Sequence, residues 1–440
     1  MHLTFVNLSV HPVSIKATSR NDRKEYTLLS KSLIELRKAD RTFSLAGAGF
    51  PEEKYGWPTL DKVLPDEEFY VKVIKTGTSP WTVAKVSQSC PWRVYCRRVS
   101  RKRTNVLIFE NRNLASFLSE IPDAVPLSSL CLPGTHDTMA FYGWPISQCQ
   151  SADTALPMQL VLGIRLLDIR LSLIKGRLIS YHSSYPQRTP FLTILSDLHA
   201  FLTSSISFRE TVVVSIKQED MDASPVEFSA AVKEEIMQGP GGIDMWFLEN
   251  RIPMLGEVRG RAVLFSRFGA DGSGWERGLE GMGIHPTNWP DSEKHGFTWE
   301  LKGTLVRTHD WYHIPSFLSI PEKTQLSTSL LVPPSNDLSN PVLSITYFSA
   351  SSFPFATPTV VSTGFGWPSF GFGVEGVNSR VGGWLLDALS GTSVDGKMNL
   401  EDGPRIRAWT LMDFFLEPGD AGVVPLLVEC NFRGRMGERL

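Results

Sequence analysis

Two histidines stand where predicted strands end, and together they could provide acid–base chemistry. His136 follows a Pro-Gly-Thr turn after the apolar segment 130–133, and Asp137 comes directly after it. His182 ends the alternating run 178–182. Because an imidazole titrates close to neutral pH, two of them can serve as base and acid in one reaction. The alternative is that both are structural histidines whose nitrogens are satisfied inside the fold.

Charged side chains occur at the same kind of position elsewhere. Asp168 and Arg170 lie two residues apart on one predicted strand, so their side chains share a face, and Lys217 ends another apolar run. A buried guanidinium needs a carboxylate or a phosphate as partner. The pair is therefore either an internal ion pair or an arginine that faces a substrate phosphate while Asp168 holds it. The cations together favour an anionic substrate.

The elements that must position these residues alternate between strand and helix from about residue 125. The predicted strands are 130–133, 165–171, 178–182, 211–217, 262–268, 305–311, 343–349 and 408–414, and amphipathic stretches include 192–205, 226–237 and 381–389. This alternation predicts a parallel α/β barrel or a doubly wound sheet. No Gly-x-Gly-x-x-Gly follows the first strand, which weighs against a dinucleotide-binding sheet.

Polar residues gather at or just past the carboxyl ends of these strands, where a barrel builds its active site. They are His136, Arg170, His182, Lys217, Arg267, Asp310 and Asp413.

Before residue 110 the pattern has period two instead. Short predicted strands at 3–10, 69–74, 81–86 and 104–109 are separated by turn-rich segments. Several short strands at this spacing predict an all-β, sandwich-like unit. The expected organisation is an all-β N-terminal domain of unknown role at 1–110, followed by a barrel at 120–440.

Composition excludes several classes of protein. The 440 residues carry 44 Lys+Arg and 46 Asp+Glu, a formal net charge of −2, which argues against a dedicated nucleic-acid binder. No apolar run reaches the roughly 18 residues that span a bilayer, and the first ten residues alternate instead of forming a signal peptide. The odd number of five cysteines, without a Cys-x-x-Cys pair, suits a reducing compartment. A cytoplasmic location is the default expectation, with membrane association or secretion by a non-classical route as alternatives.

A series of segments resembles the catalytic X region of the bacterial-type phosphatidylinositol-specific phospholipases C. They are Leu-Cys-Leu-Pro-Gly-Thr-His-Asp-Thr at 130–138, Gly-Ile-Arg-Leu-Leu-Asp-Ile-Arg at 163–170, Tyr-His at 181–182 and Glu-Thr-Val-Val-Val-Ser-Ile-Lys at 210–217. The similarity continues at 259–267, 306–312 and 409–413, in the same order and with matching spacing. The resemblance implies a distorted TIM-type barrel that acts on a phospholipid.

The resemblance also implies roles for individual residues. His136 matches the general base that takes a proton from the inositol 2-hydroxyl, and Asp413 orients it. His182 matches the general acid that protonates the diacylglycerol oxygen, assisted by Asp137. Arg170 stabilises the charge on the phosphoryl oxygens. The positions that match substrate-binding residues are Asp168, which anchors Arg170, and Lys217, Arg267, Asp310 and Tyr312.

Arg170 stands where calcium-dependent relatives carry a carboxylate ligand. A guanidinium supplies positive charge by itself and repels Ca²⁺, whose ligands are oxygens. The expectation is an enzyme without a metal or another cofactor.

Aromatic residues in two Gly- and Pro-rich stretches, 348–355 and 364–372, suit a bilayer interface. Trp367 and Phe370 are the candidate membrane contacts, and a phospholipid surface is the expected partner. The alternative is an aromatic cluster that packs over the barrel. A second candidate for lipid contact is a run of six cations, Arg93, Arg97, Arg98, Arg101, Lys102 and Arg103. The alternative is that these cations lie on a solvated strand face.

The function that these observations favour is cleavage of phosphatidylinositol, or a glycosylated form of it, to diacylglycerol and a cyclic inositol phosphate. One alternative is a phosphodiesterase for another head group, of the glycerophosphodiester or sphingomyelinase type. The other is a barrel that binds lipid without catalysis.

Overall fold

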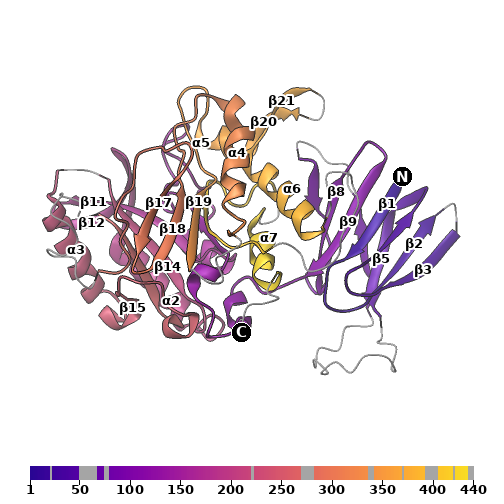
Figure 1. Ribbon diagram of the computed structural model, residues 1–440, viewed down its shortest axis with the longest axis horizontal. Coiled ribbons are helices and arrows are strands. Elements are labelled where there is room, and N and C mark those ends of the chain that lie inside the picture. Colours follow the sequence, from indigo (N-terminus) through magenta and orange to yellow (C-terminus); the bar gives the residue numbers. More distant parts are fainter. Residues whose placement is uncertain are drawn as a thin grey trace.

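Two groups of strands lie side by side, with helices between them (Figure 1). The computed structural model describes residues 1–19, 22–48, 67–73, 79–219, 222–268, 282–334, 341–368, 371–391, 405–419 and 422–434.

The first 110 residues form two sheets. A five-stranded sheet has the order β4 (Ser32–Leu36), β1 (His2–Asn7), β9 (Arg103–Glu110), β8 (Trp92–Arg98) and β7 (Trp81–Val83). A four-stranded sheet has the order β3 (Asp22–Leu28), β2 (Val13–Ser19), β5 (Ala39–Gly47) and β6 (Phe69–Lys72). Alternating side chains such as Leu3, Phe5 and Val13 bury one shared core between the sheets. The other face of the five-stranded sheet contributes Leu107 and Phe109 to the core of the rest of the chain.

An eleven-stranded sheet dominates the remainder. Its main path is β15 (Trp246–Phe247), β16 (Ala262–Arg267), β14 (Val212–Gln218), β11 (Leu166–Ile174), β10 (Leu132–Thr135), β22 (Trp409–Met412), β19 (Val342–Tyr347), β18 (Thr304–His309) and β17 (Phe297–Leu301). Within the described strands the ladder does not join β15 and β16 to β17 and β18, and the isolated bridge from Phe265 of β16 reaches Ile284, which lies before β17. The sheet is a distorted TIM-type barrel, the fold that the family resemblance implied.

Helices cover the outside of this sheet (Figure 1). They are α1 (Leu156–Val161), α2 (Phe191–Thr203), α3 (Pro225–Gln238), α4 (Ile320–Ser329), α5 (Pro358–Thr363), α6 (Val377–Leu389) and α7 (Val424–Glu429). Helix α3 shows how the sequence fixes a start, because Ser224 and Glu227 form a capping box around Pro225. None of the helices in the described ranges combines the length and the apolar character required to cross a bilayer.

Two elements differ from the sequence-based expectation. The predicted barrel strand at 178–182 is β12 (Arg177–His182), which pairs antiparallel with β11 and with β13 (Tyr185–Pro190). It is part of a hairpin extension because only a two-residue turn separates it from β11, whereas parallel strands need a longer crossover. The stretch expected as an aromatic loop contains the hairpin β20 (Gly364–Trp367) and β21 (Phe372–Glu375).

Candidate active site

The two strands that precede His136 and Asp413 are neighbours in the sheet. Strands β10 and β22 pair in parallel and in register, so His136 and Asp413 are the first residues beyond the two strand ends. The close approach requires glycine at position 134, since a Cβ there would lie 2.5 Å from the carbonyl oxygen of Thr410. Strand pairing therefore brings together two side chains that are 277 positions apart.

His136 is held from both sides of its ring. Its Nδ1 lies 2.8 Å from Oδ1 of Asp413, and its Nε2 lies 2.7 Å from Nη2 of Arg170. A guanidinium can only donate, so Nε2 must accept and the proton of the neutral ring sits on Nδ1. The lone pair of Nε2 therefore faces the guanidinium of Arg170. A carboxylate that orients an unprotonated imidazole in this way is the arrangement of a general base.

The surroundings keep His136 neutral. Burial lowers its pKa well below 6.5, and the charge of Arg170 lowers it further. An unprotonated base therefore persists through neutral pH. Tyr312 closes one side, with its ring centre 5.3 Å from that of His136.

Asp137 lies between the two histidines. Its Oδ2 is 3.3 Å from Nε2 of His136 and 3.6 Å from Nε2 of His182, and its Oδ1 is 2.9 Å from Nε of Arg170. The backbone of Asp137 is left-handed, with φ +44°, which aspartate tolerates better than most residues. Burial raises the pKa of this carboxyl to about 6, although Arg170 opposes the shift. The shared carboxylate connects a base, an acid and a cation.

His182 is oriented by the backbone of the loop that follows β10. Its Nδ1 lies 2.8 Å from the carbonyl oxygen of Ser147, so Nδ1 carries a proton and donates it. Its Nε2 then faces Asp137. The thiol of Cys149 is 3.8 Å from the same Nδ1.

Arg170 is fixed by three carboxylates. Asp168 Oδ2 accepts from Nε at 3.2 Å and from Nη2 at 3.1 Å, and Glu219 Oε1 accepts from Nη1 at 3.0 Å. Asp137 is the third partner. Burial opposes ionisation of Asp168, but Arg170 and Arg267 outweigh it and lower its pKa well below the usual range. A planar donor locked in this way is suited to a phosphate.

Three cations lie in one row across neighbouring strands. Arg170 on β11 stands opposite Lys217 on β14, which stands opposite Arg267 on β16. The charge of Arg170 lowers the pKa of Lys217, and the ammonium lies 3.5 Å from Oε1 of Glu219. The carboxylates of Asp168 and Glu219 lie against this row and balance part of its charge.

The remaining predicted binding residues join this row. Arg267 donates to the hydroxyl of Tyr347 at 2.9 Å and lies 3.6 Å from Oδ1 of Asp168. Its Nη2 is 4.0 Å from Oδ2 of Asp310, which also accepts from the indole of Trp289 at 3.0 Å. Arg267, Tyr347 and Asp310 are therefore connected to the row of cations by side-chain contacts.

His136, Asp137 and Cys149 could in principle hold a metal ion, and they are the one such group of three among the described residues, with ligand atoms within 4.8 Å of one another. Arg170 already donates to the histidine and to the carboxylate of this group. A cation there would meet the guanidinium charge, and a thiol with an imidazole is a poor set for Ca²⁺. Metal independence stays a prediction, with its test below.

No family model matches this chain. It is 29% identical over 161 residues to a 1-phosphatidylinositol phosphodiesterase of Listeria monocytogenes, covering 34% of this chain and 48% of the relative. It is 27% identical over 161 residues to the protein of the same name from Staphylococcus aureus, covering 35% and 51%. The matched region thus spans about half the length of these curated relatives.

A solved phosphatidylinositol-specific phospholipase C from S. aureus superposes with a TM-score of 0.55 at 18% identity, covering 72% of this chain and 98% of that structure. This chain has the fold of the bacterial phosphatidylinositol-specific phospholipases C. The resemblance noted in the sequence is confirmed.

Within this phospholipase C fold, the structure brings all ten predicted polar residues into one connected cluster. They are His136, Asp137, Asp168, Arg170, His182, Lys217, Arg267, Asp310, Tyr312 and Asp413. Their roles in catalysis and binding stay predictions.

Three further residues of this cluster were not predicted from the sequence. Glu219 bridges Arg170 and Lys217 and could have been found, because it lies two positions past Lys217 on the same face. Gln150 donates to the carbonyl oxygen of His136, and Cys149 lies beside His182. Both occupy an irregular loop, whose path no periodicity reveals.

Trp367, one of the two predicted membrane contacts, is 60% exposed at the end of β20. Its ring lies against that of Phe372. Phe370 lies outside the described residues. Trp367 is therefore not part of an aromatic cluster buried over the barrel.

Proposed function

We propose that this chain cleaves phosphatidylinositol, or a glycosylated form of it, to diacylglycerol and a cyclic inositol phosphate. The observation that carries the proposal is the line from Asp413 through His136 to Arg170, which leaves an unprotonated Nε2 beside a fixed guanidinium. The similarity to proteins named 1-phosphatidylinositol phosphodiesterase supports the substrate class.

The proposed reaction is an internal displacement at phosphorus. His136 Nε2 takes the proton of the inositol 2-hydroxyl, and that oxygen forms a bond to phosphorus. The bond from phosphorus to the glycerol oxygen breaks, and His182 gives its Nε2 proton to that oxygen. An internal nucleophile lowers the entropic part of the activation barrier, and Arg170 stabilises charge on the phosphoryl oxygens.

Phosphorus NMR of products from phosphatidylinositol vesicles, recorded with EDTA present, tests this proposal. A cyclic inositol phosphate signal is expected. Turnover that requires added Ca²⁺ would contradict metal independence, and no turnover in either condition would contradict the proposed substrate.

His182→Ala is expected to be rescued by a better leaving group. A nitrophenolate leaves without a proton, whereas a glycerol oxygen needs one, so the loss with the natural lipid should be at least about 100-fold and the loss with a nitrophenyl inositol phosphate much smaller. Comparing kcat/KM on the two substrates checks this. His136→Ala is the matched control, because its loss should be similar on both. An equal loss in His182→Ala on both substrates would exclude the role as acid.

Activity is expected to fall on acidification only below pH 6.5. His136 must be unprotonated to act as base, and its lowered pKa places protonation below that value. The carboxyl of Asp137, with a pKa of about 6, loses its charge in the same region. The pH profile of kcat/KM reports these groups in the free protein. An acid limb centred at pH 7 or above would contradict the assignment.

We further propose that the mouth docks on a phospholipid surface. Trp144, 73% exposed, lies in the loop whose Ser147 carbonyl binds His182. Phe353 is exposed in a segment where the backbone of Ser351 donates to the carbonyl oxygen of Tyr312 at 2.9 Å. Exposed aromatic side chains in two segments that contact the site suit a bilayer interface.

Trp144→Ala and Trp367→Ala are each expected to weaken binding to phosphatidylinositol vesicles by about tenfold, because each substitution removes a large apolar side chain that the proposed docking buries in the lipid. Sedimentation with vesicles measures this. Tyr70→Ala is the control, since Tyr70 is 71% exposed on β6 of the N-terminal sheets. Unchanged affinity in both tryptophan variants would remove the docking surface from the proposal.

A further inference from the structure

Helix α6 lies between the N-terminal sheets and the barrel (Figure 1). Trp81 at the start of β7 packs on it so closely that a Cβ on Gly382 would lie 2.2 Å from its ring. The indole of Trp81 donates to the carbonyl oxygen of Ser379 at 2.7 Å. Arg97 adds a two-pronged contact to Asp387, with distances of 3.1 and 2.9 Å. Only glycine at position 382 permits this contact.

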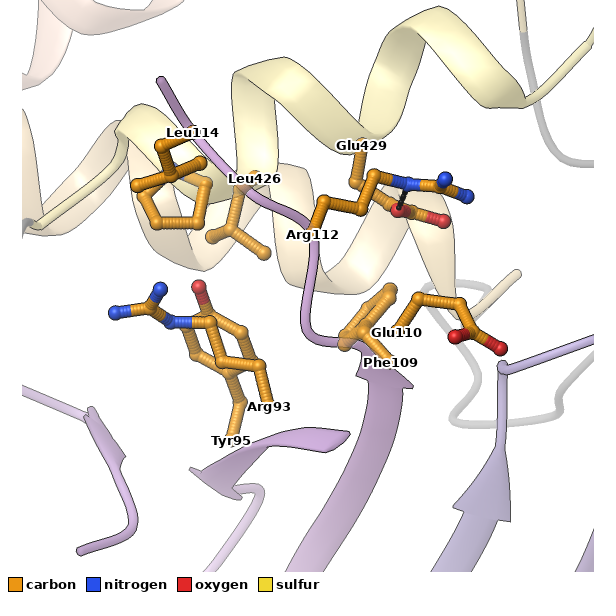
Figure 2. A pocket seen from close by; sticks show the side chains of 9 residues that line it. Arg93, Tyr95, Phe109, Glu110, Arg112, Leu114, Leu426 and Glu429 are labelled. Atoms are coloured by element: carbon orange, nitrogen blue, oxygen red, sulfur yellow. Dashed lines mark hydrogen bonds and ion pairs between the residues drawn. The ribbon is translucent and has the colours of Figure 1, made fainter. Parts of the chain in front are cut away.

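A second contact reaches α7. Arg112, just after β9, donates from Nε to Glu429 at 2.9 Å, and Figure 2 shows this ion pair beside Phe109 and Leu426. The cavity that remains there is about 10 Å³, which holds no more than one water molecule. The part of the junction around Arg112 and Glu429 is therefore a packed contact between two parts of the chain.

The first turn of α6 holds the turn that carries Asp413. Asn378 is buried, and its Nδ2 donates to the carbonyl oxygens of Asp413 at 2.9 Å and of Phe414 at 3.2 Å. Phe414 has φ +45°, a left-handed conformation that is unfavourable for a residue with a large side chain. Its backbone N–H donates to the carbonyl oxygen of Cys149 at 2.8 Å. Such a conformation persists only where the surroundings impose it.

We propose that Asn378 is a positioning residue for Asp413, and that the N-terminal sheets keep it in place by holding α6 through Trp81 and Arg97. The inference rests on the proposed function and assigns a task to the part of the chain before residue 110. Without the amide of Asn378, Phe414 relaxes from its left-handed conformation. The carboxylate of Asp413 then leaves Nδ1 of His136, and the base loses its orientation.

Two substitutions test the link from α6 to the base. Asn378→Asp keeps the shape of the side chain but removes both N–H donors, and Asn378→Ala removes the group. Each is expected to lower kcat by about 10- to 100-fold, because small misplacements of catalytic groups cost this much. KM should stay within about twofold, since the binding residues lie on other strands.

A spectroscopic measurement separates positioning from general damage. In wild type the Nδ1–H of His136, bonded to a carboxylate, should give a downfield proton NMR signal that His136→Ala removes. The Asn378 variants are expected to lose or shift this signal while their thermal unfolding remains cooperative. Retention of the signal and of kcat in Asn378→Asp would overturn the proposal.

Milder substitutions test the link from the N-terminal sheets to α6. Trp81→Phe keeps an aromatic ring and removes the donor to Ser379, and Arg97→Ala removes the contact to Asp387. The double variant is expected to show the same NMR change and a several-fold lower kcat. Arg103→Ala is the matched control, because Arg103 pairs with Glu35 inside the N-terminal sheets at 3.2 Å. A double variant that behaves like this control would overturn the proposed link from the N-terminal sheets to α6.

The result also distinguishes this inference from the proposed function. If wild type does not cleave phosphatidylinositol, the function fails, but the NMR signal and its loss in Asn378→Asp still report positioning. If wild type is active and Asn378→Asp equals it, the positioning role fails alone.

Discussion

Replacing His136 with alanine is expected to lower kcat/KM on phosphatidylinositol by at least about 10³-fold, because the internal nucleophile then has no base. The ring is the group in the structure with an unprotonated nitrogen held beside Arg170. Phosphorus NMR rates with vesicles measure the loss.

Asp413→Asn gives an independent control for the same assignment. The amide has the shape of the carboxylate, but it can also donate and so favours the wrong tautomer of His136, with an expected loss of similar order. The His182→Ala comparison on two leaving groups separates the base from the acid. Activity within about tenfold of wild type in His136→Ala would contradict the mechanism.

Arg170→Lys is expected to lower kcat by about 10²- to 10³-fold although the charge is kept. The guanidinium donates in one plane to Asp137, Asp168 and Glu219, and an ammonium cannot reproduce that fork. A lysine in this position would also leave one or more buried carboxylates without a partner. Stopped assays with vesicles give kcat directly.

The control for this variant is Arg251→Lys. Arg251 also contacts two carboxylates, Glu249 and Glu257, but it lies at the surface and far along the chain from the strand ends that form the mouth. Its kcat should equal that of wild type. Full activity of Arg170→Lys would show that a positive charge is sufficient and that the planar geometry of the guanidinium is unimportant here.

The site could be predicted where it depends on strand ends. His136 and Asp413 lie one residue past paired strands, and Arg170, Lys217 and Arg267 share one register, so strand assignment alone placed them at one edge. Their mutual distances were not predictable, because they depend on which strands become neighbours.

The parts that escaped prediction depend on irregular backbone or on contacts between distant segments. Nothing in the sequence distinguishes Asn378 from other helix residues. Its hydrogen bonds to the left-handed turn at Phe414 are visible only in the structure. The hairpin that contains β12 was taken for a barrel strand because alternation does not reveal the direction in which a strand pairs. The hairpin β20–β21 depends on glycines with positive φ, such as Gly366 and Gly373, that tolerate the twist.

The pairing of β10 with β22 also sets an order of events during synthesis. His136 leaves the ribosome 277 residues before Asp413, an interval of roughly 14 to 55 s at about 5–20 residues per second. Through that interval β10 has no β22 beside it, and the imidazole has no carboxylate on Nδ1. A nascent chain therefore carries every other group of the cluster before it carries a working base. In the proposed mechanism the base is therefore complete only once the last strand has been made.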